Sequence, residues 1–236
     1  MNSPGQHIDR PRRGNVSQAV NLDPVWHAAV DAERRATDCQ LDDIWQDYVR
    51  GRLRAIWESI GPERILLIGL VRGDEKGVDP IDAKIAARIF AGDQQKCVAG
   101  DLGLAPSTVS GRYLRALHGL DLKRNNVPLP LILAAQAWLG VVGVPAAKSA
   151  FFKAAGRVCM LVSVPRPFTS SMIGLTPAER DVAQWIIEGC SRFDIAHERG
   201  TSVNTVSRQC HAISDTLRSS GRYALVRHAV ERHCFR

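Results

Sequence analysis

Residues 189–207 read GCSRFDIAHERGTSVNTVS, and residues 92–110 read GDQQKCVAGDLGLAPSTVS. Subtracting 97 from the first stretch places Gly200 on Gly103, and both stretches begin with Gly and end in Thr-Val-Ser. An internal repeat outweighs local patterns, because each copy of a repeated sequence forms the same structural unit. We therefore expect two similar units within one polypeptide.

The residues before each copy predict the start of a helix. Residues 176–179 read TPAE, in which Thr can cap the helix, Pro suits its first position and Glu can complete a capping box. Subtracting 97 gives residues 79–82, which read DPID and repeat the cap, the proline and the acid. This agreement lies outside the stretches first aligned, so it independently supports the duplication.

Each copy predicts three helices, the third of which has a regular apolar stripe. In the second copy the helices cover about 177–188, 191–198 and the residues that follow a cap at Ser202, with turns at Gly189 and Gly200. The stripe of the third helix consists of Val206, Cys210, Ile213 and Leu217, and in the first copy of Val109, Tyr113, Ala116 and Leu120. This pattern is typical of a helix-turn-helix, whose third helix enters the major groove of DNA.

The start of the third helix is the candidate DNA-binding surface. Asn can pair with adenine there, and Arg with guanine or phosphate. The candidates in the second copy are Ser202, Asn204, Thr205, Ser207, Arg208 and His211. Those in the first copy are Ser107, Thr108 and Ser110, with Arg112 and Arg115 nearby. The first copy is poorer in base-reading groups, because Gly111 and Leu114 stand where the second copy has Arg208 and His211.

Residues 173–231 resemble the LuxR/GerE-type DNA-binding domain. The resemblance rests on LTPAE at 175–179, on EGCSRFDIA at 188–196, on the Thr-Val-Ser at the start of the third helix, and on SGRYALV at 220–226. Ser207 and Gln209 depart from the family, which usually has Lys and His there. The resemblance implies a DNA-binding domain whose fourth helix, entered through 220–226, mediates dimerisation.

The first copy, at residues 79–120, resembles the same family or the related sigma-factor region 4 type more distantly. Residues 129–139 are the candidate for its fourth helix, with Leu131 and Ile132 in the role of Leu225 and Val226.

Two further segments predict β-hairpins. Residues 52–58 alternate in polarity, residues 64–72 are rich in Ile, Leu and Val, and Gly-Pro-Glu lies between them. A helix over 63–71 is the rival interpretation, because ILLIGLV has no decisive period. Residues 147–154 and 158–164 form a similar pair around Ala-Gly. We also expect a helix starting near Asp23 and another over 41–50.

These patterns predict a mainly α fold of two tandem helix-turn-helix units, each preceded by a short β-hairpin. Residues 1–23 are expected to be a disordered basic tail. Residues 24–140 would form the N-terminal unit, with its helix-turn-helix at 79–120. Residues 141–236 would form the C-terminal unit, with its helix-turn-helix at 175–231.

The composition favours nucleic acid as the partner. The 236 residues include 31 Lys and Arg, most of them Arg, against 24 Asp and Glu, which gives a net charge of +7. The six cysteines show no CxxC pair or zinc-ligand spacing, so we expect reduced thiols and no metal. We also find no phosphate loop or catalytic motif, and expect neither enzyme activity nor a cofactor. Without a signal peptide or a long apolar run, we expect a cytoplasmic, nucleoid-associated protein and no membrane partner.

The sequence therefore predicts a transcription regulator that binds specific sites in double-stranded DNA. Its two units would act as an internal pseudo-dimer or within a homodimer. The alternative is an interaction protein that uses the same helical surfaces to contact RNA polymerase or another regulator.

Overall fold

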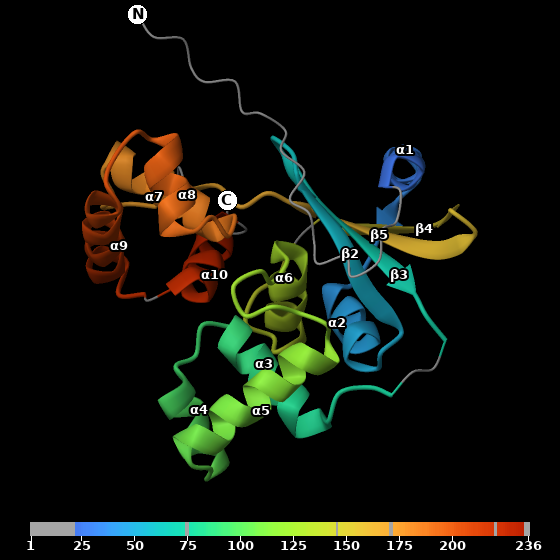
Figure 1. Cartoon of the computed structure of the whole chain (residues 1–236), viewed down its shortest axis with the longest axis horizontal. Coiled ribbons are helices and arrows are strands. Elements are labelled where there is room, and N and C mark those ends of the chain that lie inside the picture. Colours follow the sequence, from blue (N-terminus) through green and yellow to red (C-terminus); the bar gives the residue numbers. More distant parts are fainter. Residues whose placement is uncertain (1–21, 74–75, 145, 170–171, 220, 234–236) are drawn as a thin grey trace, which may run out of the picture.

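The structure is a computed structural model that describes residues 22–73, 76–144, 146–169, 172–219 and 221–233. The tail expected over residues 1–23 lies outside these ranges, except for Leu22 and Asp23. The helices are α1 (Leu22–Glu33), α2 (Leu41–Val49), α3 (Pro80–Phe90), α4 (Gln95–Leu102), α5 (Pro106–Gly119), α6 (Leu129–Trp138), α7 (Pro177–Ile187), α8 (Arg192–Glu198), α9 (Val203–Leu217) and α10 (Gly221–His233). The strands are β1 (Thr37–Asp38), β2 (Leu53–Ile60), β3 (Arg64–Val71), β4 (Lys148–Ala154) and β5 (Arg157–Pro165). Figure 1 shows the sheet on one side of the molecule and the groups α3–α5 and α7–α10 away from it.

Both predicted hairpins are confirmed. β2 pairs antiparallel with β3, and β4 pairs antiparallel with β5. The rival helix over residues 63–71 is wrong, because this segment is a strand. The turn between β2 and β3 closes through a hydrogen bond from the Gly61 amide to the Arg64 carbonyl at 2.9 Å.

The expected mainly α fold, with a separate hairpin for each unit, is wrong. The described strands form one antiparallel sheet in the order β1-β4-β5-β3-β2, which β3 and β5 join at its centre. This pairing crosses the boundary expected between residues 140 and 141. The molecule therefore has an α+β fold in which both helical groups share one sheet.

The two faces of the central strands explain why the hairpins unite. Leu66 and Ile68 of β3 lie in a cluster with residues of α1. Ile65 and Leu67 face the other way, into the main core that contains α2 and α6. A strand that is apolar on both faces is typical of a sheet covered on both sides. An isolated hairpin would have left these side chains in water.

Helix α6 lies between the sheet and the helical groups. Every residue from Leu129 to Gln136 is buried. The carboxylate of Glu58, itself buried in β2, accepts a hydrogen bond from the Leu129 amide at 2.7 Å. This contact satisfies a free N–H at the start of α6 and attaches the helix to the sheet. The helix expected over 129–139 is thus confirmed as an element of the core.

Candidate nucleic-acid interface

The second three-helix unit, α7–α9, begins with the predicted capping box. The Thr176 amide donates to Glu179 Oε2 at 2.8 Å, and the Glu179 amide donates to Thr176 Oγ1 at 3.3 Å. A second box, which we did not predict, starts α8: Ser191 and Asp194 exchange the same pair of bonds. Its signal was present in the sequence as Ser-x-x-Asp.

Helix α9 starts at the predicted cap. Ser202 Oγ accepts a hydrogen bond from the Thr205 amide at 3.1 Å and also contacts the Thr205 hydroxyl at 2.9 Å. Val206 and Ile213 are fully buried against α7 and α8, whereas Cys210 and Leu217 are only partly buried. The predicted stripe therefore faces the core of this unit, and the opposite side of α9 is left open.

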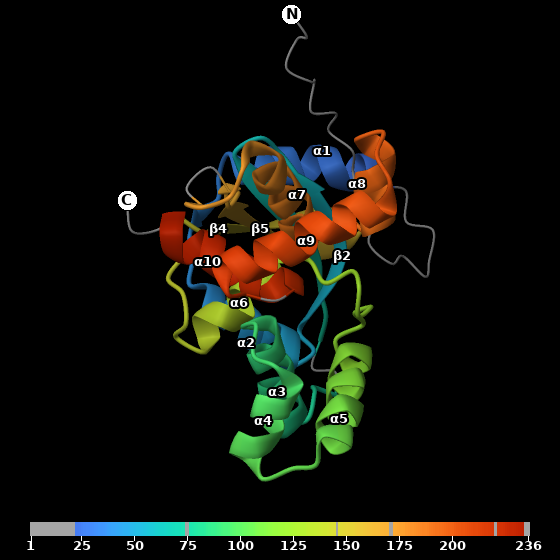
Figure 2. The same ribbon diagram turned by 90° about the vertical axis from the view of Figure 1, so that its left-hand side faces the viewer.

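The open side of α9 carries the polar residues predicted for DNA. Ser202, Asn204, Thr205, Arg208 and His211 are exposed, and Ser207 is half-buried. Figure 1 places α9 at the side of the molecule opposite the sheet, and Figure 2 shows it at the front of the side view. The six predicted residues of this copy thus lie together on one accessible helix.

Asn204, Arg208 and His211 follow one another at intervals of four and three, so they share one face of α9. Among the residues that the structure describes, Arg208 has neither a hydrogen bond nor an ion pair. Its neighbour Gln209 is different, because Gln209 Oε1 accepts a hydrogen bond from Arg199 at 3.0 Å. We refer to the three residues Asn204, Arg208 and His211 as the α9 face. The exposed Asp215 lies one turn after His211. Its negative charge would repel a phosphate backbone, so the surface suited to DNA ends before it.

In the first three-helix unit, α3–α5, the two predicted arginines form hydrogen bonds within the unit, whereas Arg208 of the second unit forms none with the described residues. Arg112 Nη1 donates to Asp82 Oδ1 at 2.7 Å, and Arg115 Nε donates to Asp82 Oδ2 at 3.1 Å. Asp82 is only 4% exposed and belongs to α3. Both guanidinium groups are therefore directed to the unit's own first helix.

The charge of Asp82 depends on these arginines. Burial by itself raises the pKa of the Asp82 carboxyl, but the hydrogen bonds and charges of Arg115 and Arg112 outweigh it. The pKa therefore lies below its ordinary value, and the carboxylate holds α3 to α5.

The other predicted residues of the first copy, Ser107, Thr108 and Ser110, lie on the first turns of α5. Ser107 and Thr108 are exposed, and Ser110 is half-buried. The side of α5 that corresponds to the α9 face also exposes Leu114, to 51%. Gly111 and Leu114 thus take the places of Arg208 and His211 here, while Arg115 is exposed to 64% and bonded to Asp82 through its Nε.

Helix α10 connects the two units. The ring of Tyr223 lies 5.2 Å from that of Phe90 in α3, and its hydroxyl lies 3.3 Å from the Tyr113 hydroxyl in α5. Gly92 has a φ of +90°, and a Cβ there would lie 2.9 Å from the Ala224 Cα. This glycine therefore permits both the turn after α3 and the close approach of α10.

Polar contacts strengthen the same junction. Gln136 of α6 is fully buried, and its Nε2 donates to the Phe90 carbonyl at 2.8 Å and to the Tyr223 carbonyl at 3.3 Å. Arg222 donates to the Ile187 carbonyl at 3.0 Å and to the Val127 carbonyl at 2.7 Å. The start of α10 is thereby bound to α7, to α6 and to the loop before α6.

A buried ion pair joins the second unit to the sheet. Arg166, directly after β5, forms a salt bridge with Glu188 at the end of α7, and both residues are less than one tenth exposed. Arg166 Nη1 also donates to the Gly61 carbonyl at 3.3 Å, in the turn between β2 and β3. The orientation of α7–α9 is thus set by the sheet as well as by α10.

Comparison with known protein families, with curated proteins and with solved structures finds no match to this chain. Within the described ranges, no helix has the length and apolar character needed to cross a lipid bilayer.

The Asp82 contacts predict a specific pH dependence of stability. Replacing Asp82 with Asn should lower the free energy of unfolding at pH 7 by about 1–2 kcal/mol, because a charge-assisted hydrogen-bond pair is lost. The folded-state pKa is depressed, so this stabilisation is complete above the unfolded-state value of about 3.9 and disappears as the pH falls through the folded-state value. Urea denaturation of both proteins from pH 7 down to pH 3 measures the difference.

The matched control is Asp93→Asn, because Asp93 also pairs with an arginine, Arg88, but lies outside the α3–α5 contact. It should leave the α3–α5 contact intact. If Asp82→Asn lowers the free energy of unfolding as much at pH 3 as at pH 7, the electrostatic explanation is wrong.

Proposed function

We propose that this protein is a transcription regulator that binds specific sites in double-stranded DNA through the α9 face. The observation that carries the proposal is the exposed Arg208 between Asn204 and His211, at the start of a helix whose other side is buried. Recognition helices present their first turns to the major groove, where Arg pairs with guanine and Asn with adenine. The net charge of +7 adds a favourable attraction to DNA.

The resemblance of residues 173–231 to the LuxR/GerE-type domain supports the same role. The resembling segment contains a capping box at Thr176, a turn at Gly189 and a cap at Ser202, and these features support the proposal. Ser207 is half-buried and Gln209 is bonded to Arg199, so neither takes the part of the family's Lys or His. Arg208 is the cation that replaces them in this chain.

The first unit has a smaller role in the proposed DNA binding than the second. Its arginines are held by Asp82, and its surface lacks a counterpart of Arg208. The fourth helices α6 and α10 contact each other within one chain. We infer that the protein acts as an internal pseudo-dimer, in which the first unit positions the second and contributes weaker contacts to DNA. It would act in the cytoplasm, on the nucleoid, without a cofactor and without enzyme activity.

Substitutions in the α9 face should separate specific from general binding. Arg208→Ala and Asn204→Ala should each weaken binding to a site selected from random DNA by about 5- to 150-fold, because one base contact contributes about 1–3 kcal/mol. Binding to unselected DNA should weaken less, since that binding depends mainly on overall charge. Fluorescence anisotropy with labelled duplexes at fixed salt measures both affinities.

Ser107→Ala is the matched control, because Ser107 is the first-copy counterpart of Asn204 and is also exposed. It should change neither affinity by more than about twofold, within the usual effect of an exposed substitution. Equal losses on selected and unselected DNA, or no loss at all for Arg208→Ala, would contradict base reading by α9.

A second candidate function is contact with RNA polymerase through the first unit. The observation in its favour is the exposure of Leu114 and Ile81 on this unit, to 51% and 48% respectively. If this function holds, purified RNA polymerase should bind the chain without DNA, and Leu114→Asn should weaken that binding while Arg208→Ala should not. Absence of binding to the purified polymerase would reject this candidate and leave the DNA proposal untouched.

A further inference from the structure

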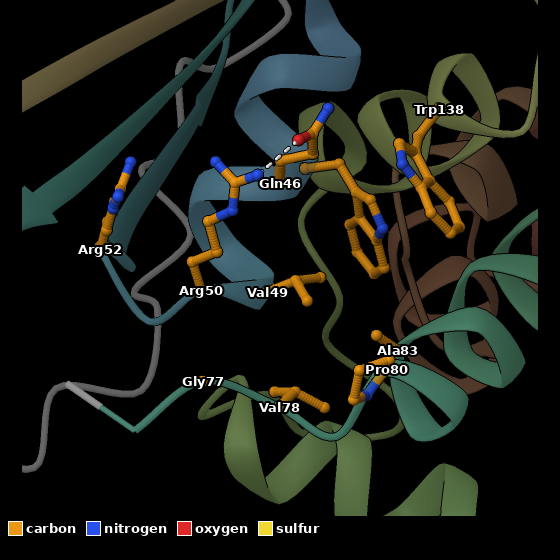
Figure 3. A pocket seen from close by; sticks show the side chains of 10 residues that line it. Gln46, Val49, Arg50, Arg52, Gly77, Val78, Pro80, Ala83 and Trp138 are labelled. Carbon is orange, nitrogen blue, oxygen red and sulfur yellow. Dashed lines mark hydrogen bonds between the residues drawn. The ribbon is translucent and has the colours of Figure 1, made fainter. Parts of the chain in front are cut away.

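A cavity of about 610 Å³ lies on the first half of the chain, away from the α9 face. It lies between α2, the segment before α3 and the end of α6 (Figure 3). Its volume falls in the range of about 300–1,000 Å³ that is typical of sites for small molecules. No role in DNA binding requires this space.

The walls of the cavity are mainly apolar and aromatic. Trp45 of α2 and Trp138 at the end of α6 line it, with ring centroids 6.5 Å apart. Val49, Val78 and Pro80 add aliphatic surface. Trp45 is buried, yet its indole Nε1 has no hydrogen-bond acceptor among the described residues. Trp138 is 37% exposed, so part of the aromatic wall is open to a ligand.

The charged side chains among the described residues that line the cavity are both positive. Arg50 and Arg52 line it, and none of the described lining residues is a carboxylate. Arg50 Nη2 donates to Gln46 Oε1 at 3.1 Å, which orients the guanidinium with a neutral partner (Figure 3). Arg52 pairs with Asp47 at 3.7 Å, so a ligand's carboxylate is assigned to Arg50 alone. Guanidinium groups beside an apolar wall match a ligand that has both an apolar body and a carboxylate.

We propose that this cavity binds a small aromatic carboxylate. The partly exposed indole ring of Trp138 would contact its apolar body, because offset and edge-on aromatic contacts stabilise such pairs, and the buried ring of Trp45 lies behind it. The guanidinium of Arg50 would receive its carboxylate. This inference goes beyond the proposed DNA binding and does not depend on it.

The position of the cavity gives such a ligand access to the first unit. Pro80 and Ala83 line it and belong to α3. The Val78 amide donates to the Val49 carbonyl at 2.8 Å, so the segment before α3 is held against the end of α2. A bound ligand would bridge α2 and α3, the helix that α10 also contacts.

The test uses the intact chain, labelled with ¹⁵N, and 2-naphthoate as the probe. We expect saturable shifts of the indole N–H signals of Trp45 and Trp138, and none for Trp26 and Trp57, which lie in the cluster on the opposite face of the sheet. The neutral amide, 2-naphthamide, should bind about tenfold more weakly, because it lacks the charge that Arg50 recognises.

Variants locate the carboxylate. Arg50→Gln should weaken 2-naphthoate binding about tenfold, and Arg50→Lys should restore part of the affinity, because it restores the charge without the planar donor pair. Arg34→Gln, at an exposed arginine directly after α1, is the matched control and should bind as the parent protein does. Well-dispersed amide spectra verify that each variant is folded.

The proposal is overturned if millimolar 2-naphthoate produces no saturable shift of Trp45 or Trp138. It is also overturned if the shifts occur at Trp26 or Trp57 instead. Equal affinity for the acid and the amide, or an Arg50→Gln variant that binds as well as the parent protein, would reject the carboxylate site.

Discussion

The pairing of β3 with β5 is the interaction on which the rest of the structure depends. It brings residues about a hundred positions apart into register, from Arg64 opposite Pro165 to Leu70 opposite Cys159. β3 leads into the first three-helix unit and β5 into the second. Because the two strands are antiparallel, the units leave this central pair at opposite ends. The sheet, rather than a flexible linker, therefore sets the path of the chain between them.

The second constraint is the packing of α10 on the first unit. Gly92 and Ala224 meet at a distance that leaves no room for a Cβ, and Tyr223 contacts both Phe90 and Tyr113. Together with the buried Arg166–Glu188 pair, this contact holds α7–α9 at two separate points. One surface of the helix that the family resemblance assigns to dimerisation is thereby used inside the chain. If α9 binds DNA, its orientation relative to the sheet and the first unit is consequently fixed by these two contacts.

The local elements could be predicted from the sequence because their signals are local. The caps at Asp79, Thr176 and Ser202 and the two hairpin turns each depend on a few neighbouring residues. The union of the hairpins could not be predicted in this way. The apolar face that β3 and β5 share is visible in the sequence, but which strands pair is decided by packing between distant segments.

The candidate site was predictable to a similar degree. The repeat and the helical period identified the α9 face, and its residues are exposed together. The same reasoning selected Arg112 and Arg115, but it could not find their bond to Asp82, because their counterparts in the second copy, Gln209 and Ala212, are not charged. The aromatic cavity was also missed, since Trp45 and Trp138 come from helices that are far apart in the sequence. In each case a contact between distant elements decides what a side chain can do.

Amide hydrogen exchange on the intact chain, with and without a selected DNA duplex, shows whether α9 is the helix that contacts DNA. The first N–H groups of a helix have no partner within the helix and exchange rapidly, so a ligand that covers them is readily detected. DNA should slow exchange over residues 202–211, at the start of α9, and should have little effect on residues 106–115 of α5. Protection of α5 alone, or of neither helix, would contradict DNA binding by α9.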